Sequence, residues 1–185
     1  MLALMRFPKP VVAAINGPAV GIGTTLLLHC DMTYATPTAF FWMPFFRLAL
    51  VPEFCSSTLL AAAVGPARAN EMLLFGRRLE AAEAASAGLI SAVLPADGFL
   101  QEVRRRVTEG LTGQPLAAAS APIFKRLLRE PERVRLEALL AAEFDALDAR
   151  FRAGEPQAAQ AEALRQRREA KMGKPTASGT SRPRL

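Results

Sequence analysis

Residues 10–23 read Pro-Val-Val-Ala-Ala-Ile-Asn-Gly-Pro-Ala-Val-Gly-Ile-Gly, and this stretch decides the fold. The apolar, partly β-branched run at residues 10–15 is typical of a buried strand in a parallel sheet. The three glycines and one proline that follow it predict a tight turn. The next apolar residues predict a helix, roughly from Ile22 to His29. A helix that begins on such a turn presents unpaired backbone N–H groups, which suit an anion or a developing oxyanion.

The chain has 185 residues, of which 51% are hydrophobic, enough for one domain with a sizeable core. Its formal net charge of +6 could indicate nucleic-acid binding. Residues 163–185, however, hold seven basic residues and one acid, which accounts for the whole net charge. This segment also lacks the interleaved aromatic residues of a single-strand binder. We therefore expect a solvated basic tail and no nucleic-acid partner.

The chain contains two cysteines, Cys30 and Cys55, and one histidine, His29. So few cysteines fit a reducing compartment, and one histidine excludes a multi-histidine metal site. We expect neither a metal nor a redox cofactor. No apolar run approaches the ~20 residues that span a bilayer, so we expect no membrane partner. The composition favours a cytoplasmic location, with a peroxisomal one as the alternative because the chain ends in Arg-Leu.

Strands and helices alternate in the first part of the chain, and helices alone follow. This order indicates an α/β core at residues 1–114 and a C-terminal helical region at residues 115–172. Residues 173–185, rich in Gly, Pro, Ser and Thr, are predicted to be a disordered basic tail.

Local signals predict further element boundaries. Asp31–Ala35 and Leu89–Leu94 are predicted strands. Ser56 or Ser57 is a plausible N-cap of the following helix. Pro131 is predicted to separate two helices of the C-terminal region.

Residues 9–23, followed by the Cys30-Asp31 pair, resemble the signature of the crotonase (enoyl-CoA hydratase/isomerase) superfamily. Three downstream segments resemble the same family: Gly-Pro-Ala-Arg-Ala at 65–69, Phe-Gly-Arg-Arg-Leu at 75–79 and Gly-Leu-Ile at 88–90. The resemblance implies an α/β fold with a spiral β-β-α core and a C-terminal helical region that forms trimers or hexamers. It also implies acyl-CoA thioester substrates, with CoA as part of the substrate and no separate cofactor.

Members of this family polarise the thioester carbonyl with two backbone N–H groups. One of these donors matches Ile22. The other belongs to a glycine-containing loop upstream of the matched region, so we expect the N-terminal part of the family's core to be missing here. The resemblance further implies substrate contacts at six positions: Ala19, Gly21, Thr25, Pro44, Phe45 and Leu48.

The family's hydratases use two glutamates, which would align with Thr25 and Phe45. Neither residue is acidic, so hydration by that mechanism is excluded. Between residues 1 and 70 the only acids are Asp31 and Glu53. Asp31 follows the first helix and is interpreted as a structural hydrogen-bonding residue beside a strand.

Glu53 lies in Pro-Glu-Phe-Cys-Ser-Ser at residues 52–57, which is similar to the Pro-Glu-x-Cys-Ser-Ser region of the Δ3,Δ2-enoyl-CoA isomerases. The resemblance implies that Glu53 alone moves a proton from C2 to C4 while the oxyanion turn stabilises a dienolate. Apolar neighbours would raise its pKa toward the range useful for proton transfer. The alternative interpretation is an acid that the helix dipole favours.

Several alternatives remain open on sequence alone. Phe54 could narrow an acyl pocket or simply pack. The aromatic residues 40–42, with Phe45 and Phe46, could line an acyl tunnel or form core. Lys125 and Arg126 could contact a CoA phosphate, although a solvated face is the commoner case. The alternative function is a non-catalytic crotonase-fold protein that binds acyl-CoA or a protein, or an inactive fragment.

Overall fold

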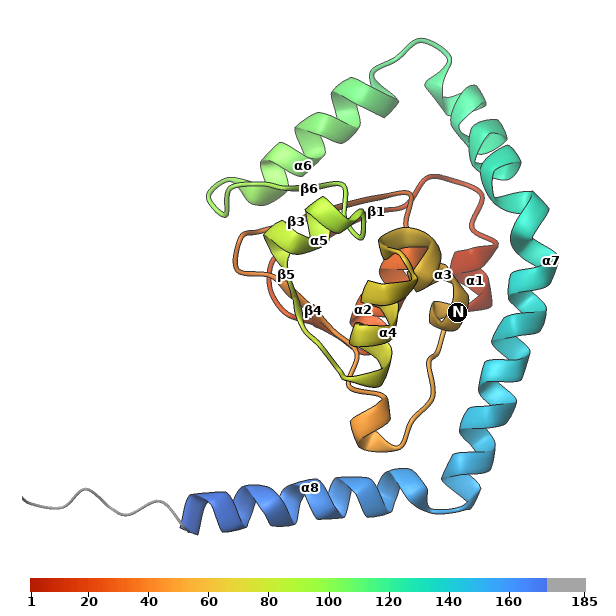
Figure 1. Ribbon diagram of the computed structural model, residues 1–185. Coiled ribbons are helices and arrows are strands. Elements are labelled where there is room, and N and C mark those ends of the chain that lie inside the picture. The colour runs from red at the N-terminus through yellow and green to blue at the C-terminus, as the bar shows by residue number, and fades with distance from the viewer. Residues whose placement is uncertain (173–185) are drawn as a thin grey trace, which may run out of the picture.

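The computed structural model describes residues 1–172, and the predicted tail at 173–185 lies outside the described residues. The long helices α7 and α8 run along the side and the foot of a mixed α/β core (Figure 1). The elements in chain order are α1 (Leu2–Met5), β1 (Val12–Ile15), β2 (Ala19–Val20), α2 (Ile22–Thr25), the 3₁₀ helix η1 (Leu26–His29), β3 (Met32–Ala35), β4 (Phe40–Trp42), the 3₁₀ helix η2 (Phe46–Leu48), α3 (Ser56–Val64), α4 (Pro66–Leu74), β5 (Leu79–Glu80), α5 (Ala81–Ala87), β6 (Ala92–Val93), α6 (Phe99–Val107), the π-helical turn η3 (Thr108–Thr112), α7 (Ala117–Arg152) and α8 (Glu155–Met172).

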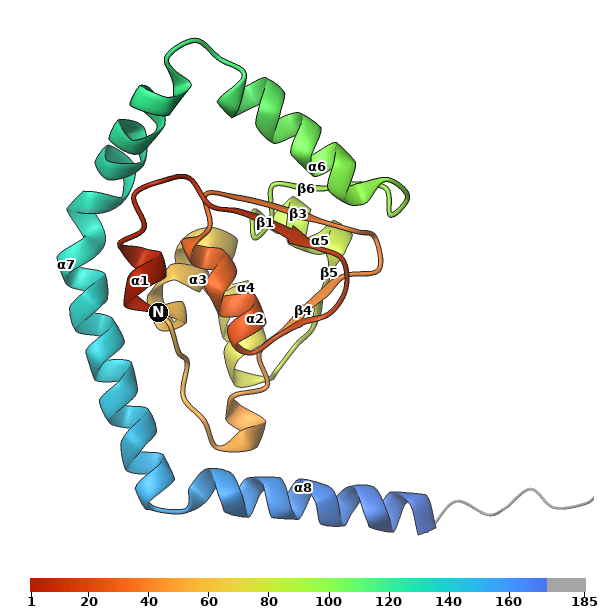
Figure 2. The same cartoon turned by 180° about the vertical axis from the view of Figure 1, so that it is seen from behind.

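Two small sheets organise the core. In the first, β1 pairs in parallel with β3, with Val12 opposite Met32, and β3 pairs in parallel with β6. In the second, β2 pairs in parallel with β4, and β4 pairs antiparallel with β5. Seen from behind, β1 and β3 lie side by side (Figure 2). The main core packs strands from both sheets against α3, α4 and α5; its largest fully buried side chains include Phe41, Met43, Leu60, Met72 and Leu79.

The strand predicted at residues 10–15 forms, but the expectation that it is buried is wrong. β1 is the end strand of its sheet, paired only with β3. Its residues are half-buried apart from the exposed Ala14. The strand and one face of α2 and η1 line an open groove of about 560 Å³. The apolar run therefore packs on one side only.

Other predicted boundaries shift by a few residues. The Asp31–Ala35 strand is confirmed as β3, whereas the strand predicted at Leu89–Leu94 shortens to β6. The helix predicted from Ile22 to His29 is confirmed in extent, but its second half is the 3₁₀ helix η1.

Pro131 does not separate two helices, because α7 runs unbroken from Ala117 to Arg152. A proline inside a helix removes one backbone hydrogen bond and costs about 3 kcal/mol. Here α7 is tied to the core on both sides of Pro131, by Lys125 before it and Glu143 after it, and both side chains are buried.

Lys125 anchors the first half of α7 to residues that lie just before β1 and β3. Its Nζ lies 2.9 Å from Asp31 Oδ2 and donates to the Lys9 carbonyl at 2.7 Å. Asp31 Oδ2 also accepts the Val11 N–H at 2.7 Å. The structural interpretation of Asp31 is therefore confirmed. The solvated-face interpretation of Lys125 is wrong, because Lys125 is 6% exposed and its charge is neutralised by Asp31.

We predict that Asp31→Ala lowers the free energy of unfolding by about 3 kcal/mol, because it leaves the buried Lys125 charge without an opposite charge beside it. The matched control is Asp148→Ala, which removes an acid from the exposed Asp148–Arg152 pair on α7, the helix that carries Lys125. The control should change stability little, since exposed pairs contribute little. Urea unfolding curves give both values. Equal losses in the two variants would contradict the buried-pair explanation.

The turn before α2 depends on a glycine. Gly21 has φ 55° and ψ −121°, a conformation that L side chains rarely adopt. Its N–H donates to the Trp42 carbonyl at 2.8 Å, and its carbonyl accepts the N–H groups of Thr24 and Thr25 at 2.8 and 3.1 Å. Gly21 thus joins β4 to the first turn of α2.

Gly21→Ala should lower the free energy of unfolding by about 1–3 kcal/mol through backbone strain. The strain is separable from crowding, since an added Cβ would meet only the Phe45 ring, at 3.9 Å. Gly17→Ala is the control, because Gly17 has open space around it and no positive φ. Thermal unfolding of the two variants tests the difference. An unchanged melting temperature for Gly21→Ala would show that the turn tolerates a side chain.

Candidate functional site

The candidate oxyanion donor, Ile22, is the first residue of α2. The first N–H groups of a helix have no partner within it. Within residues 1–172 the Ile22 N–H makes no other hydrogen bond, either to backbone or to a side chain. The Ile22 side chain is 43% exposed, so the turn lies at the surface of the described chain. This N–H is available to an external acceptor.

Three of the six predicted substrate contacts, Ala19, Gly21 and Thr25, lie in or beside the turn that precedes α2. The other three, Pro44, Phe45 and Leu48, lie in the segment that follows β4. Around the turn, Ala19 and Thr25 are buried, and the Thr25 hydroxyl donates to the Ile22 carbonyl at 3.5 Å. Pro44 and Phe45 are also buried. Gly21 and Phe45 are neighbours, since a Cβ added at Gly21 would lie 3.9 Å from the Phe45 ring. Leu48 lies farther along, half-buried on η2.

Helices α2 and η1 follow each other directly, and the segment from Phe45 to Phe54 contacts this pair at both of its ends. Phe45 lies against Gly21 at the start of the pair. Phe54 stacks on His29 at its end, with ring centroids 3.9 Å apart and an interplanar angle of 20°. Glu53 directly precedes this stacked residue. The structure therefore places the Glu53 loop against the helix that carries the candidate oxyanion donor.

Glu53 is half-buried and directly precedes Phe54 and Cys55, which belong to an apolar cluster. Burial, and secondarily the Glu143 carboxylate, raise the pKa of Glu53 above its ordinary value. Across the part of the chain that the structure describes, its carboxylate forms no ion pair and no hydrogen bond. The group is thus a free carboxylate with an increased affinity for a proton.

Phe54 and Cys55, the two residues after Glu53, both have left-handed backbone conformations, with φ of 55° and 61°. Such conformations are uncommon for residues other than glycine. The Phe54 side chain is 2% exposed and packs with Cys55 and Leu140. Of the two alternatives for Phe54, packing is the one observed.

The sequence prediction missed Glu143. Its carboxylate caps α3: Oε2 accepts the Cys55 N–H at 2.6 Å, and Oε1 accepts the Ser57 N–H at 3.2 Å and the Ser57 hydroxyl. The predicted N-cap is therefore wrong, since the cap position is Cys55 and neither serine side chain caps the helix. The Ser56 hydroxyl is buried and has no hydrogen-bond partner among the described residues.

A signal for Glu143 existed in the sequence. Glu143 comes seven, four and three residues after Leu136, Leu139 and Leu140. Residues at these spacings lie on one face of a helix. An acid in such an apolar stripe indicates a buried carboxylate with a partner elsewhere. The identity of that partner could not be read from the stripe.

His29 and Cys55 are both buried, and the polar atom of each side chain is hydrogen-bonded within the chain. His29 Nε2 lies 2.8 Å from the Phe54 carbonyl, and because a carbonyl only accepts, Nε2 carries the proton. Burial lowers the pKa of His29, which favours the neutral ring. The Cys55 thiol donates to the Leu136 carbonyl at 3.2 Å, and burial raises its pKa to about 11. Neither group is placed to act as a nucleophile or base.

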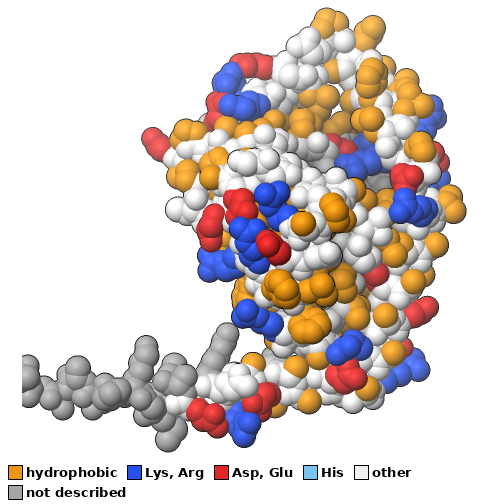
Figure 3. Space-filling view, in the orientation of Figure 1, with side chains coloured by type: hydrophobic (Ala, Val, Ile, Leu, Met, Phe, Trp, Pro, Cys, Tyr) orange, Lys and Arg blue, Asp and Glu red, His pale blue; other side chains and the backbone are white. Residues whose placement is uncertain are grey.

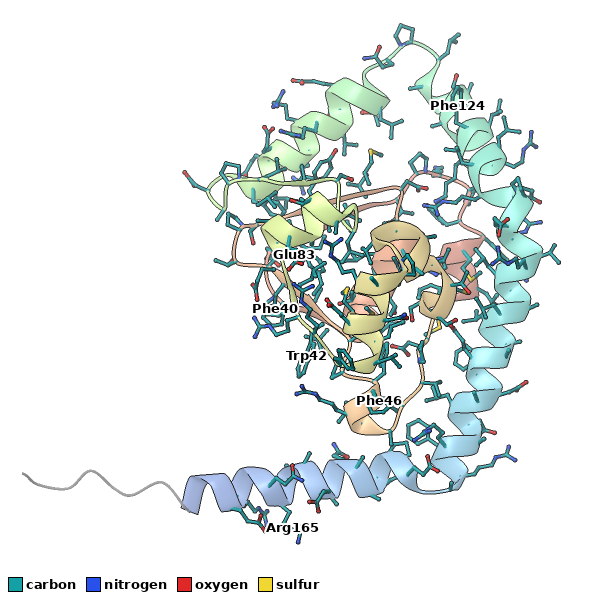
Figure 4. The ribbon with its side chains drawn as sticks, viewed as in Figure 1. Phe40, Trp42, Phe46, Glu83, Phe124 and Arg165 are labelled. Carbon is teal, nitrogen blue, oxygen red and sulfur yellow. The ribbon has the colours of Figure 1, made fainter. Side chains whose placement is uncertain are left out.

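The aromatic residues do not share one environment. Phe41 and Phe45 belong to the core. The guanidinium of Arg78 lies 3.6 Å from the centre of the Phe40 ring, and Trp42 Nε1 donates to the Gly76 carbonyl at 2.9 Å. Phe46 is 68% exposed, on η2 at the side that faces α8 (Figure 4). The five rings do not line a single tunnel.

Elsewhere on the described surface, the groups that a metal ion or a membrane would need are absent. Over residues 1–172 there is no group of three His, Cys, Asp or Glu side chains that could hold a metal ion. No helix in this range is both long and apolar enough to cross a membrane. Acids and bases on α4, α5 and the turn between α4 and β5 pair with each other, as the mixed charges in Figure 3 show; they are Arg68, Glu71, Arg77 and Glu83.

Relatives of known sequence include enoyl-CoA delta isomerases and chromodomain Y-like proteins. The chain is 42% identical over 137 residues to "Enoyl-CoA delta isomerase 3, peroxisomal" of Mus musculus, covering 74% of this chain and 42% of that protein. It is 47% identical over 123 residues to "Chromodomain Y-like protein 2" of Mus musculus, covering 66% of this chain and 23% of that protein. The chain thus spans less than half the length of these relatives.

A solved enoyl-CoA hydratase/isomerase from Pseudoalteromonas atlantica has the same architecture. It superposes with a TM-score of 0.82 at 36% identity, over 89% of this chain and 65% of that chain. The sequence profile of the enoyl-CoA hydratase/isomerase family matches residues 1–169. The chain therefore belongs to the enoyl-CoA hydratase/isomerase family and has its crotonase fold.

Proposed function

We propose that this chain carries an acyl-CoA isomerase site that moves the double bond of a 3-enoyl-CoA to the 2-position. The observation that carries the proposal is the free, half-buried carboxylate of Glu53 with its raised pKa. The other acid within residues 1–70, Asp31, is engaged by Lys125 and by the Val11 N–H. The mouse relative named as an enoyl-CoA delta isomerase supports the same reaction.

The proposed reaction needs one base and one oxyanion site. The Glu53 carboxylate takes a proton from C2, and the C2–H electron pair moves into the thioester to give a dienolate. The Ile22 N–H, at the start of α2, stabilises the oxygen of this dienolate. Glu53 then returns the proton to C4, and the double bond stands between C2 and C3. One carboxylate suffices, because it recovers its original state in each cycle.

Hydration is disfavoured by the residues that occupy the positions of the hydratase acids. Thr25 is fully buried, and its hydroxyl is directed to the Ile22 carbonyl. Phe45 is 4% exposed and apolar. Neither can activate a water molecule as a general base at neutral pH. Proton transfer within the substrate is therefore the better supported reaction.

A binding protein without turnover is the second candidate, since the chain is also similar to Chromodomain Y-like protein 2, whose name states no catalytic activity. A protein of this kind would bind an acyl-CoA but leave the double bond in place. Calorimetric binding of a 2-enoyl-CoA, together with the isomerase assay, separates the two candidates.

We propose further that copies of this chain assemble through α7. Five large apolar side chains of its first half are at least half exposed, which is costly in water unless a partner covers them; they are Ile123, Phe124, Leu127, Leu128 and Val134. Phe124 lies on the upper part of this helix (Figure 4). The proposed assembly is a trimer or a hexamer. The proposed location is cytoplasmic, although the mouse isomerase is named peroxisomal.

Glu53→Gln should reduce the rate of isomerisation of a 3-enoyl-CoA by about 10²–10⁴-fold, because the amide cannot accept the C2 proton. The assay follows the ultraviolet absorbance of the conjugated 2-enoyl thioester. Glu71→Gln is the matched control, an acid on α4 that pairs with Arg77 at the surface. If Glu53→Gln kept the rate of the parent chain, Glu53 would not be the base.

The pH profile gives an independent test. A base works only when ionised, so kcat/KM should fall as the pH drops through the pKa of Glu53. Because burial raises that pKa, the acid limb should lie above the ordinary glutamate value of about 4.3. The profile of kcat/KM against pH measures the limb. A limb at or below the ordinary value would contradict the proposed base.

A further inference from the structure

The peptide group between Phe54 and Cys55 is held on both of its polar atoms by side chains from distant elements. Its carbonyl accepts the Nε2–H of His29, on η1, at 2.8 Å. Its N–H donates to Glu143 Oε2, on α7, at 2.6 Å. We call His29 and Glu143 the peptide clamp. The two side chains fix the plane of the peptide group that follows Glu53 by one residue.

The backbone at this point needs to be held. Phe54 and Cys55 are consecutive residues with left-handed φ, and each such conformation costs roughly 1–2 kcal/mol for a residue with a side chain. Strained conformations persist only where the surroundings determine them. The stacking of Phe54 on His29 and the burial of Cys55 add to the two hydrogen bonds. Released from the clamp, this peptide would relax toward an ordinary conformation.

We propose that Glu143 and His29 are positioning residues for Glu53: by fixing the Phe54–Cys55 peptide they fix the direction in which the Glu53 carboxylate is presented. The catalytic consequence rests on the proposed function, whereas the geometric one does not. Neither residue needs to touch the substrate. Glu143 is 8% exposed and already accepts three hydrogen bonds from Cys55 and Ser57.

The clamp also has an electrostatic effect on Glu53. The charged or titratable groups nearest the loop, and on the elements packed against it, are Glu143 and Arg150 on α7, His29 on η1 and the Cys55 thiol. Arg150 also pairs with Glu155, Arg129 of α7 pairs with Asp31, and Arg6 at the end of α1 pairs with Glu137. Of these, Glu143 raises the pKa of Glu53. His29, with its lowered pKa, adds no compensating positive charge near neutral pH. Removal of the Glu143 charge should therefore lower the pKa of Glu53.

The test compares Glu143→Gln with Glu137→Gln in the full chain. The first variant keeps an oxygen that can accept the Cys55 N–H, but it loses the charge and the hydrogen bond from the Ser57 N–H, because an amide NH₂ cannot accept one. The second removes an acid from the same helix, where it pairs with Arg6 at the surface. Carboxyl carbon NMR of glutamate-labelled protein follows the titration of Glu53, which Glu53→Gln assigns. This measurement needs no catalytic activity.

We expect Glu53 to titrate at lower pH in Glu143→Gln than in the parent chain, and unchanged in Glu137→Gln. We also expect kcat to fall about 10–100-fold with KM nearly unchanged, as for a misplaced catalytic group. A folded Glu143→Gln variant with an unchanged Glu53 titration overturns the proposal. If no chain, the parent included, isomerises the substrate, the proposed function fails while the titration still decides the clamp.

A second pair of variants tests the other half of the clamp, and it decides the matter if Glu143→Gln does not fold. His29→Leu removes the donor to the Phe54 carbonyl, whereas His29→Gln retains an N–H at a similar reach. Hydrogen exchange at the Cys55 amide should become at least tenfold faster in His29→Leu and return toward the parent rate in His29→Gln. Equal rates in both variants would contradict the clamp.

Discussion

The conformation around Glu53 depends on a peptide group that local sequence preferences oppose. Two consecutive residues with side chains, Phe54 and Cys55, take left-handed conformations that glycine would adopt without strain. The cost is offset by contacts from η1, α3 and α7, which lie far apart in the chain. The packing of these three elements around one loop is therefore the constraint on which the candidate site depends.

Helix α7 meets this constraint with two buried charged residues, one on each side of Pro131. Lys125 is paired with Asp31, and Glu143 with the start of α3, eighteen residues and about 27 Å of helix later. A buried charge without its partner is costly, so each pair admits only one register of α7 on the core. Two such pairs fix both the rotation and the position of the helix. They also explain why a helix that contains two prolines docks unbroken along the core.

Much of the fold could be predicted because its signals are local. The strand at residues 12–15, the glycine turn and the helix from Ile22 follow from composition and order within about twenty residues. The cap of α3 could not be found in the same way. Ser56 and Ser57 satisfy the local rule for a cap, but Glu143 supplies stronger, charged hydrogen bonds from 88 residues away. The helix boundary predicted at Pro131 is wrong for the same reason, because tertiary contacts of α7 outweigh the local helix-breaking signal of the proline. The position of Glu53 was readable from its motif, whereas what holds it was not.

The long separation between Cys55 and Glu143 also affects how the chain is made. At about 5–20 residues per second, translation adds Glu143 roughly 4 to 18 seconds after Cys55. Until then the nascent chain can form its local elements, but the Glu53 loop lacks one of its two partners. Contacts of such sequence separation form late and slow folding. A chain that ends between residues 94 and 142 would keep every strand but lose the geometry of its candidate base. The amount of such a shortened product would therefore be a poor measure of its activity.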